Sequence, residues 1–194
     1  MRLFIATDLP ATLIQTISDM QKHLRSVTES ARWVRPESMH LTLKFLGEVA
    51  EEKLGAIDER LGRIRTQPFK VRVSGVGFFP NDRAPRVFWA GIESPALQEL
   101  AQKVEEETVE LGFRAEKRPF RPHLTLARSR RDRRIDTALV GESAPFLERE
   151  FGTFTTDRFY MYQSRLRPTG AEYEQLFEYR LDSGSVAVSG RLKS

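Results

Sequence analysis

The sequence has no cysteine among its 194 residues and only three histidines. Without cysteine there is no disulfide, no zinc–thiolate site and no thiol catalysis. The chain also lacks an apolar run of about 18 residues, the length that a membrane-spanning helix requires. Its apolar start breaks too early for a signal peptide. We therefore expect a cytoplasmic protein with no membrane attachment.

Motifs for three common classes of enzyme are missing as well. The sequence has no glycine-rich phosphate loop of the P-loop or dinucleotide type and no Gly-x-Ser-x-Gly elbow. The composition, 40% hydrophobic and 30% charged, is that of a globular protein. These absences leave nucleotide hydrolysis and dehydrogenase chemistry without support.

The sequence does contain the tetrapeptide His-Leu-Thr-Leu twice, at residues 40–43 and 123–126. Leucine alternates with a polar residue in both copies, which predicts a β-strand with one buried face. Residues i and i+2 of a strand share a face, so each copy presents its His and Thr together. The third histidine, His23, falls on a predicted helix outside both motifs, and we expect it to be structural.

A longer internal repeat surrounds the two motifs. Arg2–Ala6 resembles Arg86–Ala90, and the offset between these segments is almost the same as the offset between His40 and His123. Both halves have the same order, in which an apolar strand and a helix precede the motif. Two such β-α-β units packed about a pseudo-twofold axis would bring the two histidines across one cleft.

Helix signals recur in both halves. Pro10 and Pro95 mark two helix starts, and the apolar residues that follow recur every three or four positions. Shorter helices are predicted around 54–64 and 135–140, and strands over 69–76, 154–162 and 173–181. Gly75 and Gly77 indicate a bulge or a turn. The mixture of helices and strands favours an α+β fold over a doubly wound sheet.

We predict one bilobal domain over residues 1–182, built from two repeats at roughly 1–80 and 84–182. The remaining residues, 183–194, are rich in Ser and Gly and are predicted to form a disordered tail.

The paired histidines suit acid–base chemistry at phosphorus. Histidine titrates near neutrality, so one imidazole can accept a proton from water while the other gives one to a leaving oxygen. Thr42 and Thr125 would donate hydrogen bonds to non-bridging phosphate oxygens. The alternatives are core or surface histidines that hydrogen-bond to backbone, or zinc ligands completed by an aspartate from elsewhere, although no third ligand is evident near either motif.

Basic residues gather around the second motif. The net charge is +4, which favours a polyanionic partner. Arginine offers a planar fork of donors that fits phosphate oxygens. Arg128 follows the motif, and we expect it beside His123 and Thr125 if the strand continues that far. The wider cluster comprises Arg114, Lys117, Arg118, Arg121, Arg128, Arg130, Arg131, Arg133 and Arg134.

The paired motifs and their flanks resemble the two-histidine (2H) phosphoesterase superfamily. Residues 2–10, 39–48 and 121–128 are similar to its LigT-like branch, which contains the RNA 2′,3′-cyclic phosphodiesterases. The resemblance covers roughly residues 1–181. It implies a bilobal α+β fold with two antiparallel sheets around a central cleft and helices outside.

The resemblance also implies an activity and a set of roles. It implies opening of an RNA 2′,3′-cyclic phosphate, or of a cyclic nucleotide, to a 2′-phosphomonoester, with no metal and no cofactor. By position, His40 corresponds to the proton donor, His123 to the proton acceptor, and Thr42 and Thr125 to the phosphate-binding threonines. We expect a monomer.

Two other functions stay open at this point. Some superfamily members join RNA ends through a 2′–5′ linkage, which is the reverse reaction with a 5′-hydroxyl in place of water. A non-catalytic RNA-binding module could use the same basic surface for capture alone. Phe45 and Phe120, close to the motifs, are candidates for stacking on bases, and core packing is the alternative role for each.

Overall fold

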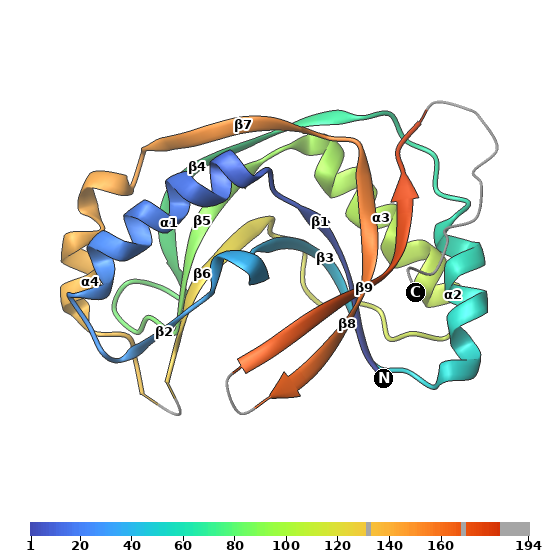
Figure 1. Cartoon of the computed structure of the whole chain (residues 1–194), viewed down its shortest axis with the longest axis horizontal. Helices are drawn as coiled ribbons and strands as arrows, with labels where there is room; N and C mark the ends of the chain where they lie inside the picture. The colour runs from blue at the N-terminus through green and yellow to red at the C-terminus, as the bar shows by residue number, and fades with distance from the viewer. Residues whose placement is uncertain (131–132, 168–169, 183–194) are drawn as a thin grey trace.

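The computed structural model describes residues 1–130, 133–167 and 170–182 (Figure 1). The tail predicted to be disordered, 183–194, lies outside the described residues. In the described part of the chain, no helix is long and apolar enough to cross a membrane.

The strands form two antiparallel sheets, which confirms the predicted α+β architecture. The first sheet has the order β3-β1-β8-β9, with β3 His40–Glu48, β1 Arg2–Asp8, β8 Arg158–Arg167 and β9 Gly170–Arg180. The second has the order β2-β6-β5-β4-β7, with β2 Ala31–Trp33, β6 His123–Ser129, β5 Val87–Glu93, β4 Phe69–Phe79 and β7 Glu150–Thr156.

Each sheet contains strands from both halves of the sequence. β4 belongs to the first half but pairs with β5 in the second sheet. β8 belongs to the second half but pairs with β1 in the first sheet. The two halves therefore exchange strands, since β4 joins the second sheet and β8, which follows β7, joins the first, so that the halves are interlocked.

The single strand predicted over residues 154–162 is wrong. Asp157 separates β7 from β8, and the two strands join different sheets. The Asp157 carbonyl accepts a hydrogen bond from the Leu181 amide at 2.8 Å, which holds this crossing point to the end of the described chain. No proline or glycine marks the crossing within this segment, so the local sequence does not reveal it.

The helices cover the outer faces of the sheets (Figure 1). α1 (Ala11–Arg25) packs against β7 of the second sheet, and α3 (Pro95–Glu110) packs against β3 and β4. The amphipathic prediction is confirmed for both, because the apolar residues at the predicted spacing are buried. α2 (Leu54–Leu61) packs on α3, and α4 (Thr137–Glu142) lies near the far end of the second sheet. Three short 3₁₀ helices are η1 (Pro36–Ser38), η2 (Glu51–Lys53) and η3 (Ala144–Phe146).

The two glycines of β4 have different reasons for being there. Gly75 has a φ of +68° and sits at a register shift between β4 and β5, so the predicted bulge is confirmed. Its Cβ would lie 2.6 Å from the Leu147 carbonyl oxygen. Gly77 instead makes room for Trp89, whose indole would lie 2.3 Å from an added Cβ.

Candidate active site on the two His-Leu-Thr-Leu strands

The two motifs start neighbouring strands of different sheets, β3 and β6, which approach each other in the middle of the molecule. Both begin with the same burial pattern, in which the leucines are buried and the His and Thr side chains are half-buried. The predicted strand with one open face is therefore confirmed for each motif. We call the side of each sheet that carries His and Thr its site face.

Each imidazole forms a hydrogen bond with the backbone of the residue two positions upstream. His123 Nδ1 lies 2.7 Å from the Arg121 carbonyl oxygen. His40 makes a backbone hydrogen bond with Ser38. A ring whose Nδ1–H donates to a carbonyl has its tautomer fixed and leaves Nε2 available for proton transfer. On β6 this arrangement leaves His123 Nε2 as the free nitrogen.

Aromatic rings surround His40. Its ring centroid lies 4.7 Å from that of Phe4, 5.0 Å from Tyr173, which meets it edge-on, and 6.3 Å from Tyr162. Burial lowers the pKa of His40 to about 4, the bond to Ser38 acts in the opposite direction, and the charge of Arg128 lowers it further. The free protein therefore holds His40 neutral at pH 7.

His123 has fewer aromatic neighbours. Phe79 meets its ring edge-on at a centroid distance of 5.1 Å. Burial again lowers the pKa, the bond to Arg121 opposes this, and the charge of Arg128 adds to the lowering. Arg128 thus acts on both histidines, which places the two imidazoles in one electrostatic environment.

Arg128 reaches the site face only because β6 carries a bulge. Thr125 pairs with Trp89 and Ala127 pairs with Phe88, so Leu126 has no partner on β5. Strict alternation would place Ala127, not Arg128, on the face of His123. The bulge reverses the phase, and Arg128 Nη2 donates to Thr125 Oγ1 at 3.4 Å. The expected neighbourhood is found, although simple alternation does not account for it.

Comparisons with known proteins show the family to which the chain belongs. The model of the family described as LigT like Phosphoesterase matches residues 8–89 and 91–173, which include both motifs. The chain belongs to this family of phosphoesterases. The resemblance to the two-histidine superfamily is therefore confirmed.

Relatives of the phosphoesterase align over nearly their whole length. An RNA 2′,3′-cyclic phosphodiesterase of Archaeoglobus fulgidus is 40% identical over 91% of this chain and 98% of its own. An RNA 2′,3′-cyclic phosphodiesterase of Thermotoga maritima is 37% identical over 96% of this chain and 98% of its own.

Solved structures of the family share the fold. TT0787 of Thermus thermophilus superposes with a TM-score of 0.79 at 31% identity, over 95% of this chain and all of that one. E. coli LigT complexed with 3′-AMP superposes with a TM-score of 0.75 at 30% identity, over 93% of this chain and 97% of that one.

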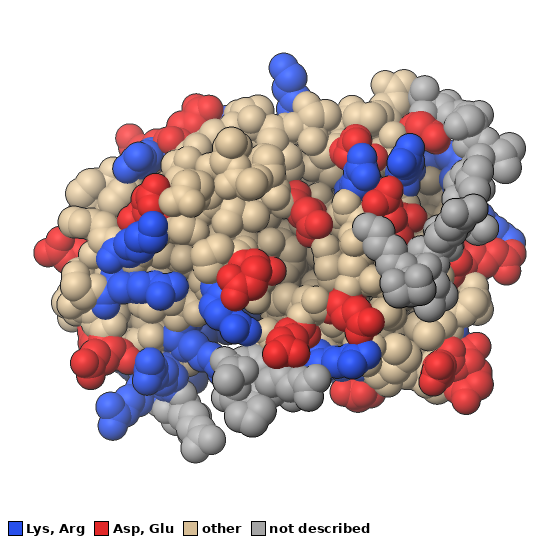
Figure 2. Space-filling model, viewed as in Figure 1, with Lys and Arg blue, Asp and Glu red and all other residues tan. Residues whose placement is uncertain are grey.

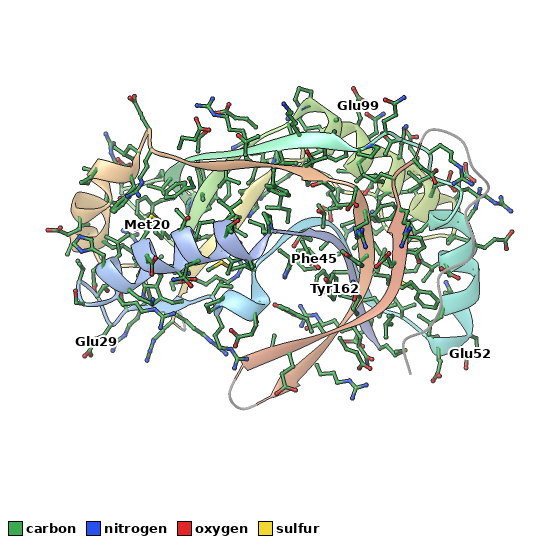
Figure 3. The ribbon with its side chains drawn as sticks, turned by 45° about the horizontal axis from the view of Figure 1, so that its top comes forward. Met20, Glu29, Phe45, Glu52, Glu99 and Tyr162 are labelled. Atoms are coloured by element: carbon green, nitrogen blue, oxygen red, sulfur yellow. The ribbon has the colours of Figure 1, made fainter. Side chains whose placement is uncertain are left out.

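A matching bulge in β3 puts Phe45 on the site face of the phosphoesterase. Leu43 has no partner on β1, and Phe45 pairs with Phe4. Phe45 is 56% exposed, and its ring lies 5.9 Å from that of Phe4. Figure 3 shows Phe45 near Tyr162 in the middle of the molecule. Phe120, in contrast, is half-buried and packs against the hydrophobic core.

Sequence reasoning missed two residues beside His40. Asp8 pairs with His40 in the register of β1 and β3, and the Tyr162 hydroxyl donates to Asp8 Oδ1 at 2.6 Å. Burial raises the pKa of Asp8, and the bond from Tyr162 opposes that rise. The internal repeat offered a signal for Tyr162. Phe79 contacts the ring of His123, and Tyr162 is its equivalent in the repeat, because the two are separated by the same offset as the two histidines.

A cavity of about 390 Å³ opens next to Asp8, between the end of β1 and the crossing from β7 to β8, with Arg158 and Tyr160 in its wall. This volume falls in the range of small-ligand pockets. Figure 2 shows Lys and Arg side chains gathered at the lower left of the view, over the end of the molecule where β2 and β6 lie. Among the described residues, no three His, Asp or Glu side chains are grouped as a metal site.

Proposed function

We propose that this phosphoesterase hydrolyses the 2′,3′-cyclic phosphate at an RNA end to a 2′-phosphomonoester. The observation that carries the proposal is the pair of strands, each presenting His and Thr on one face, with Arg128 acting on both imidazoles. Relatives at 34–40% identity are named RNA 2′,3′-cyclic phosphodiesterases, which supports the substrate class.

The reaction is an in-line displacement at phosphorus. His123 accepts a proton from the attacking water, whose oxygen forms a bond with phosphorus. The bond from phosphorus to the 3′-oxygen breaks, and His40 gives that oxygen its proton. Each transfer contributes a factor of roughly 10²–10⁴ to the rate. The product is a 2′-phosphate beside a free 3′-hydroxyl.

The low pKa of His40 makes its role depend on the substrate. A neutral imidazole has no proton to give, and the pKa of His40 is about 4 in the free protein. A phosphate anion beside the ring favours the charged form and raises its pKa. His40 therefore takes up its proton as the cyclic phosphate binds, and the anion offsets the repulsion from Arg128.

The threonines and Arg128 hold the non-bridging oxygens. Thr125 Oγ1 accepts from Arg128, so its own hydroxyl proton is free to donate to phosphate. Arg128 adds a positive charge where negative charge builds in the transition state. On the other strand Thr42 donates in the same way, and the exposed ring of Phe45 stacks on a base of the RNA end.

Side chains of this chain supply all the groups that carry the reaction, so we propose that it proceeds without metal. The proposal also includes that the protein acts as a monomer in the cytoplasm. The test incubates the protein with an RNA oligonucleotide ending in a 2′,3′-cyclic phosphate, in the presence of excess chelator. Phosphorus NMR distinguishes a 2′- from a 3′-phosphomonoester. We expect the 2′-phosphate as the product, formed at the same rate with chelator as without it.

An unopened ring, or a rate that requires added metal, would refute the proposal. A second reaction contains an RNA with a 5′-hydroxyl, since the same acid and base can join two ends through a 2′–5′ linkage. Ligation faster than hydrolysis in that mixture would make joining the principal activity instead.

A further inference from the structure

The two motif strands are both bulged at the end of the motif, and a buried polar side chain lies at or next to each bulge. In β6 the unpaired residue is Leu126, and in β3 it is Leu43, the equivalent position of the repeat. A bulge leaves a backbone group outside the ladder, and that group needs another partner when it is buried.

In β6 the anchor is Gln21 of α1. Its Nε2 donates to the Leu126 carbonyl at 3.0 Å and to the Val34 carbonyl at 3.1 Å. The Leu126 carbonyl also accepts from the Val34 amide at 2.9 Å, so both of its lone pairs are used. Gln21 is only 1% exposed, which makes it a polar group committed to the bulge and not to solvent.

In β3 the anchor is an ion pair. The Lys44 side chain is 1% exposed, and its Nζ bonds to the Glu105 carboxylate and to the Arg114 carbonyl, the latter at 3.1 Å. Glu105 also accepts from the Glu116 amide at 2.8 Å. The offset from Gln21 to Glu105 is almost the same as the offset from His40 to His123. Gln21 on α1 and Glu105 on α3 therefore occupy matching positions of the repeat.

We propose that Gln21 and the Lys44–Glu105 pair are positioning residues for the phosphoesterase reaction. Each fixes the bulge that turns the second residue after its motif, Arg128 or Phe45, onto the site face. The inference rests on the proposed function for its kinetic test, but its spectroscopic test does not require activity.

The first test replaces Gln21 by Met, which keeps the length of the side chain and removes both hydrogen bonds. If β6 loses its bulge, Arg128 moves away from both histidines. We expect kcat/KM to fall roughly 10-fold, and we expect no further loss when Q21M is added to R128A, because the two changes remove one interaction.

The second measurement is the titration of the imidazoles by NMR, in which the chain gives only three histidine signals. Arg128 is the charged group that acts on both rings, and Asp8, Tyr162 and Tyr173 are the titratable groups packed near His40. Q21M should raise the pKa of His40 and His123 in the direction that R128A does.

The matched control is Q15M, the same substitution on the exposed side of α1, where Gln15 bonds to Asp19. It should change neither kcat/KM nor either pKa. If Q21M does not fold, Q21N keeps the amide but draws it back from Leu126, and it serves as the substitute.

The β3 anchor has a different signature. K44M should resemble F45A, with a higher KM for the RNA end and an unchanged kcat, because Phe45 touches the base and not the reacting phosphate. Unchanged histidine pKa values in Q21M, or losses that multiply with R128A, would overturn the inference. If wild-type protein opens no cyclic phosphate, the proposed function fails, and the histidine titrations still decide the inference.

Discussion

The two motif strands have the same backbone plan but different surroundings. On β3, His40 lies among Phe4, Tyr162 and Tyr173, and the residue turned onto the site face is Phe45. On β6, Phe79 contacts His123, and the corresponding position holds Arg128 instead. Duplication thus supplies two equivalent His-Thr pairs, and one substituted position per strand makes one side aromatic and the other cationic.

Under the proposed function, this difference divides substrate binding between the two strands. The cationic side suits the phosphate, whose charge it can neutralise, and the aromatic side suits the base and keeps the adjacent imidazole dry. A symmetric scaffold becomes an asymmetric site through the residue that follows each bulge. Substitutions on either strand can break that asymmetry, and their expected effects range from a near-complete loss of activity to a small change in stability.

The largest effects are expected at the histidines themselves. H40A and H123A should each lower kcat by at least about 10²-fold, because each removes one proton transfer. Rates are measured on an RNA with a cyclic phosphate end. H23A is the control, since His23 lies on α1 away from both motifs, and it should keep full activity. A single histidine variant with near wild-type activity would show that the strands do not share the reaction.

Arg128 comes next. R128A should lower kcat/KM by roughly 10- to 100-fold, the loss of a hydrogen bond to a charged group, and should raise the pKa of both histidines. The matched control is R130A, two residues further along the chain. Equal losses in both variants would mean that general basic charge, and not the position after the bulge, is what matters.

The aromatic side is tested by Y173A. Removing this ring admits water to His40, so its pKa should rise from about 4 toward the ordinary value. Because His40 acts as the proton donor, a higher pKa leaves more of it protonated, and kcat/KM at pH 7 should rise by about 2- to 5-fold. Y173F is the control, because it keeps the ring in place. A kcat/KM that rises equally in both variants would contradict the desolvation argument.

The smallest effect concerns stability. The unfolded chain protonates His40 near the ordinary histidine pKa, whereas the folded protein does so only near 4. Between these values the unfolded state binds more protons, so the free energy of unfolding falls as the pH is lowered from about 6.5 to 4. Thermal unfolding at pH 7 and pH 5 measures the decrease. H40Q should reduce it, and H23Q should not.

The sequence predicts the two motif strands and their buried faces well, because duplication and periodicity are local patterns. It does not predict the bulges, since Leu126, Ala127 and the neighbouring leucines satisfy strict alternation as well as the bulged register. Nor does it predict the ring around His40, because Tyr162 and Tyr173 arrive from strands at the other end of the chain. These contacts depend on tertiary pairing.

The exchange of strands between the sheets has a consequence for synthesis of the protein. Phe4 of β1 pairs with Tyr162 of β8, so the first sheet cannot close until β8 has left the ribosome. A nascent chain that has already exposed His40 and His123 still lacks the strand that covers the first of them. Under the proposed function, the site around His40 is therefore incomplete until β8 and β9 have been made.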